Sequence, residues 1–351
     1  MQNKRLVITG IVIALLGILI YTQFREWRDF DWHTFWAQTH QIRGIHILHA
    51  VGLIYLHYGL RALRWKIFLK PLKKTSWLGL IPPTVIGFTG LALLGRPGEF
   101  IRPYLIARRE GLPLSSQIAV WTVERIFDLG AFTTLMVGAI FLSQGLRELS
   151  FYSKFREGGF VLMAGVAGLA LALLVIAKNG NRIADWAEIR LGGLKAGLGH
   201  KIAIKIREFG LGLNTIDSAW ALVQLSGISV AMWYLIALAY REVTHAYSIP
   251  ELHHLTTSKV LLLMGSSMVG SMVQLPAVGG GSQVATISAL SAIFSVPKES
   301  AVSCGILLWL VTFMSVAPLG LALAHRARLS LRQLSKESSE AEKASEAPAT
   351  I

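Results

Sequence analysis

The sequence contains few charged residues and almost no cysteine. Only 15% of its 351 residues are charged, and Cys304 is the single cysteine. One cysteine excludes both a disulfide framework within the chain and a CxxC metal site. The low charge accompanies 53% hydrophobic residues and a mean hydropathy of +0.53, which excludes an ordinary soluble domain. The sequence therefore predicts an integral membrane protein.

Motifs for nucleotide hydrolysis and for common catalytic chemistries are also lacking. The chain has no G-x-x-x-x-G-K-[ST], no H-E-x-x-H and no G-x-S-x-G sequence. His46 and His49 lie three residues apart, but no further metal ligands are evident near them. We therefore predict a transport protein rather than an enzyme. It should have no catalytic residue, no metal and no cofactor.

The formal net charge of +14 comes mostly from Lys and Arg between apolar runs. Basic residues in such positions orient a membrane protein and attract anionic lipid, so they do not indicate nucleic-acid binding. The strongest basic block, residues 61–74, predicts a cytoplasmic loop. The expected partners are membrane lipids and no nucleic acid, while a homo-oligomer is left open.

Six apolar runs are long enough to cross a bilayer: residues 6–21, 42–60, 117–142, 158–177, 218–240 and 301–324. A further run, residues 77–94, would deliver four following arginines to the outside if it crossed, against the positive-inside rule. It therefore predicts a re-entrant hairpin, with both chain termini in the cytoplasm. Residues 326–351 are rich in Ser, Glu, Ala and Lys, which predicts a disordered cytoplasmic tail.

Charged residues gather in two short motifs beside apolar runs: Glu99, Arg102, Glu124, Arg125 and Asp128. A charge at the bilayer centre costs about 2.5–3.5 kcal/mol, so five unpaired charges would cost on the order of 12–18 kcal/mol. These side chains must pair, line a wet cavity or lie near the interface. One interpretation is a cytoplasmic loop. The other is a polar transport site at which Gly95, Pro97 and Gly98 break a helix inside the membrane.

The spacing of these motifs recurs later in the chain. Glu99 precedes Arg125 by 26 residues, and Gln283 precedes Trp309 by the same interval, which gives an offset of 184 residues. The later occurrence of this spacing, which begins at Gln283, is called the second motif. It follows another Gly/Pro break within residues 260–296, at Pro276, Gly279 and Gly280.

Each half then reads as two spans, a hairpin and a third span. The first repeat covers about residues 5–143 and the second about 158–325. Because three spans is an odd number, the two halves must have opposite orientations. The predicted fold is an all-α polytopic membrane protein, with about six full spans plus two re-entrant helical hairpins in an inverted-topology repeat. The membrane domain covers residues 1–325.

These motifs resemble the flippase-like transmembrane domain of bacterial lysylphosphatidylglycerol synthases over about residues 5–325. The resemblance rests on the run from Gly95 to Arg102, on Glu124-Arg125-x-x-Asp128 and on the late Pro276-x-x-Gly-Gly. It implies a stand-alone, multi-pass protein of the bacterial cytoplasmic (inner) membrane that lacks the synthase domain. Such a protein would move an anionic, aminoacylated or isoprenoid-linked lipid between leaflets.

The second motif departs from this family's pattern at two positions. The resemblance implies Glu where Gln283 stands and Arg where Trp309 stands. Losing both partners of a buried ion pair can be nearly neutral, whereas losing one is costly. The joint replacement predicts that these two positions touch. It also puts in doubt whether the second half binds the usual head group.

We therefore expect a lipid flippase or scramblase with a charged intramembrane cavity. Arg102 and Arg125 would attract a head-group phosphate. The carboxylates of Glu99, Glu124 and Asp128 would hold these arginines or pair with a cationic head group, and Gln283 and Trp309 would complete the substrate site. The alternatives are a secondary transporter of a small solute or ion with the same repeat and, third, an intramembrane lipid-modifying enzyme.

Overall fold

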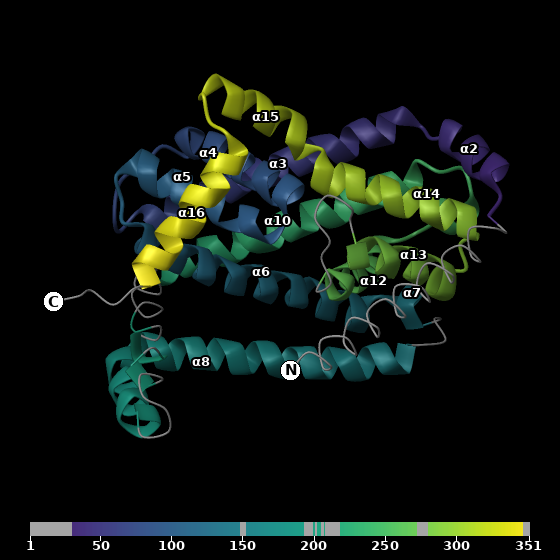
Figure 1. Cartoon of the computed structure of the whole chain (residues 1–351). Helices are drawn as coiled ribbons and strands as arrows, with labels where there is room; N and C mark the ends of the chain where they lie inside the picture. The colour runs from purple at the N-terminus through teal and green to yellow at the C-terminus, as the bar shows by residue number, and fades with distance from the viewer. Residues whose placement is uncertain are drawn as a thin grey trace, which may run out of the picture.

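A computed structural model describes residues 30–147, 152–192, 199–200, 202–204, 207, 218–271 and 280–346. Within these residues all regular secondary structure is helical and no strand occurs (Figure 1). The predicted all-α membrane protein is confirmed. The first predicted span, residues 6–21, lies outside the described residues, as do Pro276 and Gly279.

The helices of the first half are α2 (Trp32–His40), α3 (Gly44–Leu69), α4 (Trp77–Leu94), η1 (Arg96–Phe100), α5 (Ile101–Glu110), α6 (Leu114–Leu142) and α7 (Gln144–Arg147). The next helix, α8 (Tyr152–Gly192), is interrupted at Asn179, which has non-helical dihedral angles. The remaining helices are α10 (Ala219–His245), α11 (Pro250–His253), α12 (Thr257–Gly270), α13 (Gly280–Phe294), α14 (Lys298–Trp309), η2 (Leu310–Met314), α15 (Val316–Arg326) and α16 (Leu331–Glu346).

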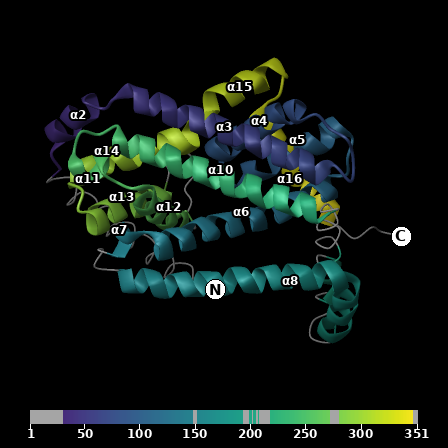
Figure 2. The same cartoon turned by 180° about the vertical axis from the view of Figure 1, so that it is seen from behind.

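Helices α3 and α10 lie side by side and run antiparallel (Figures 1 and 2). At one end His46 Nδ1 lies 2.7 Å from Glu242 Oε2, and near the other end Arg64 donates to Ser229 Oγ at 2.7 Å. Helices α4, α6, α12 and α14 contact this pair, and α8 packs on α6.

The chain folds back on itself between α4 and α5. Gly95 ends α4 with φ +70° and ψ −145°, a conformation that strongly favours glycine. Gly98 then packs directly on the carbonyl of Gly90, where a Cβ atom would collide with the backbone. The glycines of the first motif therefore form a tight helical hairpin. The predicted helix break is confirmed, while its depth in a membrane stays a prediction.

A second helical hairpin, α12 and α13, lies at the opposite end of the bundle (Figures 1 and 2). Its connecting segment includes residues outside the described ranges, but Gly280 opens α13 with φ +50°.

The offset of 184 residues recurs in the backbone after each hairpin. Each hairpin ends at a residue with positive φ, then a proline caps the following long helix. The matched pairs are Gly111 and Ser295, Pro113 and Pro297, and the helix starts Leu114 and Lys298. The two segments therefore share one local design, although their orientation in a membrane stays a prediction.

The last long helix contains one turn of π-helix, η2, between α14 and α15. Pro318 lies in α15, just after this turn. A proline ring clashes with the carbonyl four residues earlier, here that of Met314, and offers it no N–H. The π-helical turn ends at this residue, so the irregularity is placed where the proline requires it.

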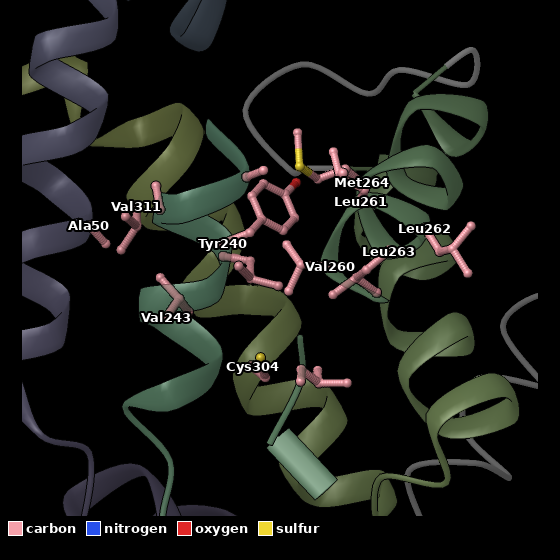
Figure 3. Close-up of a cluster of buried hydrophobic side chains, with 14 of the residues drawn as sticks. Ala50, Tyr240, Val243, Val260, Leu261, Leu262, Leu263, Met264, Cys304 and Val311 are labelled. Carbon is pink, nitrogen blue, oxygen red and sulfur yellow. The ribbon is translucent and has the colours of Figure 1, made fainter. Parts of the chain in front are cut away.

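The largest buried cluster joins both halves of the chain. It includes Tyr240, Met264 and Cys304 (Figure 3). Figure 3 shows the Tyr240 hydroxyl pointing from α10 toward Met264 of α12. The second hairpin is therefore held against the central helix pair by apolar packing.

Four helical segments of the described residues are long and apolar enough to cross a membrane: Trp77–Leu94, Ser116–Leu142, Ala219–His245 and Lys298–Arg326. The last three match predicted spans. The first is the run that we assigned to a re-entrant hairpin. The count of six spans and the return of this run to the same face stay predictions.

Two expectations differ from the structure. Residues 331–346, which we predicted as disordered, form α16, whose Leu334 is buried among Ile86, Ile101 and Leu105. The sequence of α16 is amphipathic, and its apolar face packs on the bundle, which stabilises the helix. The basic block at residues 61–74 is also no simple loop, because α3 continues to Leu69 and buries two of its arginines.

Candidate functional site

Glu124 of α6 is the centre of a buried charge cluster. The side chain is fully buried and lies within ion-pair distance of four arginines. Arg64 Nη2 donates to its Oε1 at 2.6 Å and Arg61 Nη1 to the same oxygen at 3.1 Å. Arg102 of α5 donates from both terminal nitrogens, one of them to Oε1 at 3.0 Å and the other to Oε2. Three helices are thus joined at one carboxylate.

Asp128 lies one helical turn beyond Glu124 and shares its partners. Arg64 Nη1 lies 2.8 Å from Asp128 Oδ1, and Arg125 Nη2 lies 3.1 Å from Oδ2. Arg61 reaches the same Oδ2 at 3.4 Å. An ion pair between residues three apart on one helix thus links Arg125 to Asp128.

Sequence reasoning missed Arg61 and Arg64. We assigned both to a cytoplasmic loop, but they lie on α3 with 5% and 0% exposure. Their spacing of three residues places them on one helical face toward α6, and His57 lies one turn earlier on that face. Charge counting could not reveal them, because Arg102 and Arg125 already equal Glu124 and Asp128 in number.

Aromatic rings enclose the guanidinium groups. The Arg102 guanidinium carbon lies 4.3 Å from the ring centroid of Trp65 and 5.0 Å from that of Phe88. Arg61 lies 4.8 Å from the same Phe88 ring. Rings at these distances stabilise cations electrostatically and exclude water from the ion pairs.

The cluster carries more positive than negative charge. Four guanidinium groups (Arg61, Arg64, Arg102 and Arg125) face the two carboxylates of Glu124 and Asp128. The Arg125 side chain is 41% exposed, and its buried Nε has no hydrogen-bond partner among the described residues. Arg125 is therefore the cation of this cluster that is best placed to meet a ligand.

A cavity of about 140 Å³ opens beside Arg125. It is lined by Gly87, Phe88, Leu91, Glu99, Arg102, Trp121 and Arg125. Glu99 lies at this cavity but forms no ion pair with the described residues. The expected pairing of Glu99 with Arg102 or Arg125 is therefore not seen. The arrangement can bind an anion, since the positive charge exceeds what the buried carboxylates neutralise.

Gln283 and Trp309 line a second cavity, of about 240 Å³. The same cavity reaches Leu91 and Gly95 of the first hairpin, so Leu91 lines both cavities. The two residues that replace the expected charged pair therefore line one cavity, while a direct contact between them stays a prediction.

The sequence model of one protein family, described as the lysylphosphatidylglycerol synthase TM region, matches residues 7–320. The chain belongs to this family. No curated protein and no solved structure matches the chain. The lysylphosphatidylglycerol synthase TM region is a membrane domain related to lipid handling, and the match covers both charged motifs and both cavities. The resemblance drawn from the sequence motifs is confirmed.

The histidines do not form a metal site in the structure. His46 pairs with Glu242, and His49 Nδ1 lies 3.7 Å from the same carboxylate. Within the described ranges no group of three His, Cys, Asp or Glu side chains could hold a metal ion. The charge cluster on α3, α5 and α6 is therefore the candidate site.

Proposed function

We propose that this protein moves an anionic lipid between the leaflets of a membrane, as a flippase or scramblase. The observation that carries the proposal is the excess of guanidinium charge at the cavity of Arg125, in a family of lipid-related membrane domains. A lipid phosphate would bind there by charge-assisted hydrogen bonds, to Arg125 first and to Arg102 behind it. The lipid could be aminoacylated or isoprenoid-linked, and the resemblance leaves this choice open.

The proposed route follows the two hairpins. We propose that α4–α5 and α12–α13 are re-entrant hairpins that enter the membrane from opposite sides, in an inverted-topology repeat. Their location at opposite ends of the bundle and the offset of 184 residues in their boundaries support this arrangement. Transport sites commonly lie between two such hairpins near the membrane centre. Leu91, which lines both cavities, marks the meeting point here.

Several further properties are part of this proposal. We place the protein in the bacterial cytoplasmic membrane with both termini in the cytoplasm. The protein would act as a transporter and not as an enzyme, with membrane lipids as its partners. A secondary transporter of small solutes would use the same cavities, and the assay below separates the two, because only a lipid carrier changes the leaflet distribution of a labelled lipid.

The test is leaflet exchange of labelled phosphatidylglycerol in proteoliposomes, with Arg125→Gln as the variant. We expect the wild-type chain to accelerate exchange over protein-free vesicles, and Arg125→Gln to lower that rate about tenfold. A charge-assisted hydrogen bond contributes about 1.5–3 kcal/mol, and 1.4 kcal/mol corresponds to a factor of ten. Arg108→Gln is the matched control, since Arg108 is exposed on α5 and lines neither cavity. Wild-type exchange no faster than in empty vesicles would refute the proposal.

A further inference from the structure

The two cavities occupy equivalent positions in the two halves of the chain. Adding 184 to five residues that line the Arg125 cavity gives five residues that line the larger cavity. The pairs are Gly87 and Ser271, Glu99 and Gln283, Arg102 and Thr286, Trp121 and Gly305, and Arg125 and Trp309. The larger cavity is therefore the counterpart of the charged one, built from the second hairpin and the helix that follows it.

Every charged position of the first cavity is neutral in the second. An amide replaces the carboxylate of Glu99, a hydroxyl replaces the guanidinium of Arg102, and an indole replaces that of Arg125. No Asp, Glu, Lys or Arg lines the larger cavity among the described residues. A phosphate or an ammonium group would find no opposite charge there, so an ionic ligand is disfavoured.

The larger cavity nevertheless offers unused hydrogen-bonding groups. The buried Nε1 of Trp233 has no partner among the described residues. The hydroxyls of Ser271 and Thr286 donate to carbonyls one turn earlier, at 2.6 Å and 2.7 Å, which leaves their oxygens as acceptors. The amide of Gln283 can both donate and accept. This set suits a neutral group that itself donates and accepts, as a hydroxyl does.

Size and connection favour the same ligand. The neutral cavity is the larger of the two, at about 240 Å³ against about 140 Å³ for the charged one. This volume holds about eight water molecules at about 30 Å³ each, enough for a glycerol or a sugar ring. Leu91 borders both cavities, so a phosphate at Arg125 and a hydroxylated group at Gln283 can belong to one lipid.

We infer that the larger cavity, at Gln283, Trp233 and Trp309, binds an uncharged, hydroxyl-bearing head group of the lipid whose phosphate lies at Arg125. The inference rests on the proposed function and narrows it. The preferred substrate class is a phospholipid whose head group ends in glycerol or a sugar, and not one that ends in an amine.

The test measures binding to the purified full-length chain in detergent, by calorimetry. The probes are dihexanoylphosphatidylglycerol and dihexanoylphosphatidylmethanol, which share the phosphate charge and differ in the two hydroxyls. We expect the glycerol lipid to bind about five- to tenfold more tightly, the fold-change of about one neutral hydrogen bond. Gln283→Leu and Trp233→Phe should reduce this ratio toward one, because they weaken the binding of the glycerol lipid. Gln283→Leu keeps a side chain of similar size, and Trp233→Phe removes the N–H but keeps an aromatic ring.

Arg125→Gln is the matched comparison, because it should weaken both probes to the same extent. Equal affinity of the wild-type chain for both probes would overturn the inference, as would a preference that survives both cavity variants. Tighter binding of an aminoacylated phosphatidylglycerol would also overturn it. In each of these cases the proposed lipid movement still stands. A preference for the glycerol lipid without any leaflet exchange would support the inferred site and refute the proposed function.

Discussion

At the scale of single residues, the protein concentrates its buried charge at one carboxylate. Glu124 is reached by arginines from three helices, and Asp128 shares three of these cations. Desolvation makes an isolated charge at such a site costly, so the six side chains are stable only as a group. The sequence reveals the carboxylates and two of the arginines, since they stand beside apolar runs. Arg61 and Arg64 could not be separated from the basic residues that follow them, because helix length past residue 60 is set by tertiary packing.

Glu124→Gln should be strongly destabilising. The substitution leaves four guanidinium groups with the single carboxylate of Asp128, and breaking a buried ion pair costs about 3–5 kcal/mol. We expect a loss of this size in the free energy of unfolding in detergent, measured by chemical denaturation. Glu99→Gln makes the same chemical change at a carboxylate that has no ion pair with the described residues, so its cost should stay within about 0.5 kcal/mol. Equal losses for both variants would contradict the cluster as the source of stability.

At the scale of elements, the first hairpin depends on close approach of backbone to backbone. Gly98 packs on Gly90 with no room for a side chain. The sequence predicts this break, because Gly and Pro are the residues that interrupt a helix. It does not predict that α4 runs unbroken through Pro82 and Pro83, which lie in its early turns where neighbouring helices hold it.

Gly98→Ala should therefore destabilise the hairpin by about 1–3 kcal/mol, the usual cost of overpacking. Thermal unfolding in detergent measures the effect. Gly130→Ala on α6 is the control, because a Cβ there meets nothing within 4 Å and alanine favours a helix. A loss of stability at Gly130 as large as that at Gly98 would show that the contact with Gly90 is unimportant.

Amino-acid composition gave the wrong prediction for helix α16. Its hydrophilic residues resemble a disordered tail, yet Leu334 is 2% exposed and Tyr104 donates to Glu337 at 3.0 Å. The buried side chain of Leu334 holds the helix beside the first hairpin. A contact of one side chain cannot be predicted from amino-acid composition.

Leu334→Asp should release α16 from the bundle, because an unpaired carboxylate would replace the buried apolar contact. We expect faster hydrogen exchange at residues 331–337, followed by mass spectrometry. Arg332→Asp, at an exposed neighbouring position, should leave the exchange slow. Unchanged protection in Leu334→Asp would mean that the helix is held by other contacts.

At the scale of the whole molecule, two similar halves meet at a pair of neighbouring cavities. The central claim is that these halves have opposite orientations in the membrane, which we propose from the offset of 184 residues and from hairpins at opposite ends of the bundle. The first half then presents a charged cavity and the second a neutral one. The number of spans follows from this claim and is tested with it.

Cysteine labelling tests the orientation most directly. In a Cys304→Ser background, single cysteines replace Arg108 and Ser295, which are exposed at the ends of the two hairpins. A membrane-impermeant maleimide is applied to spheroplasts and to inverted membrane vesicles. The account predicts that Arg108→Cys reacts only in inverted vesicles and Ser295→Cys only in spheroplasts. Reaction of both cysteines from the same side would contradict it.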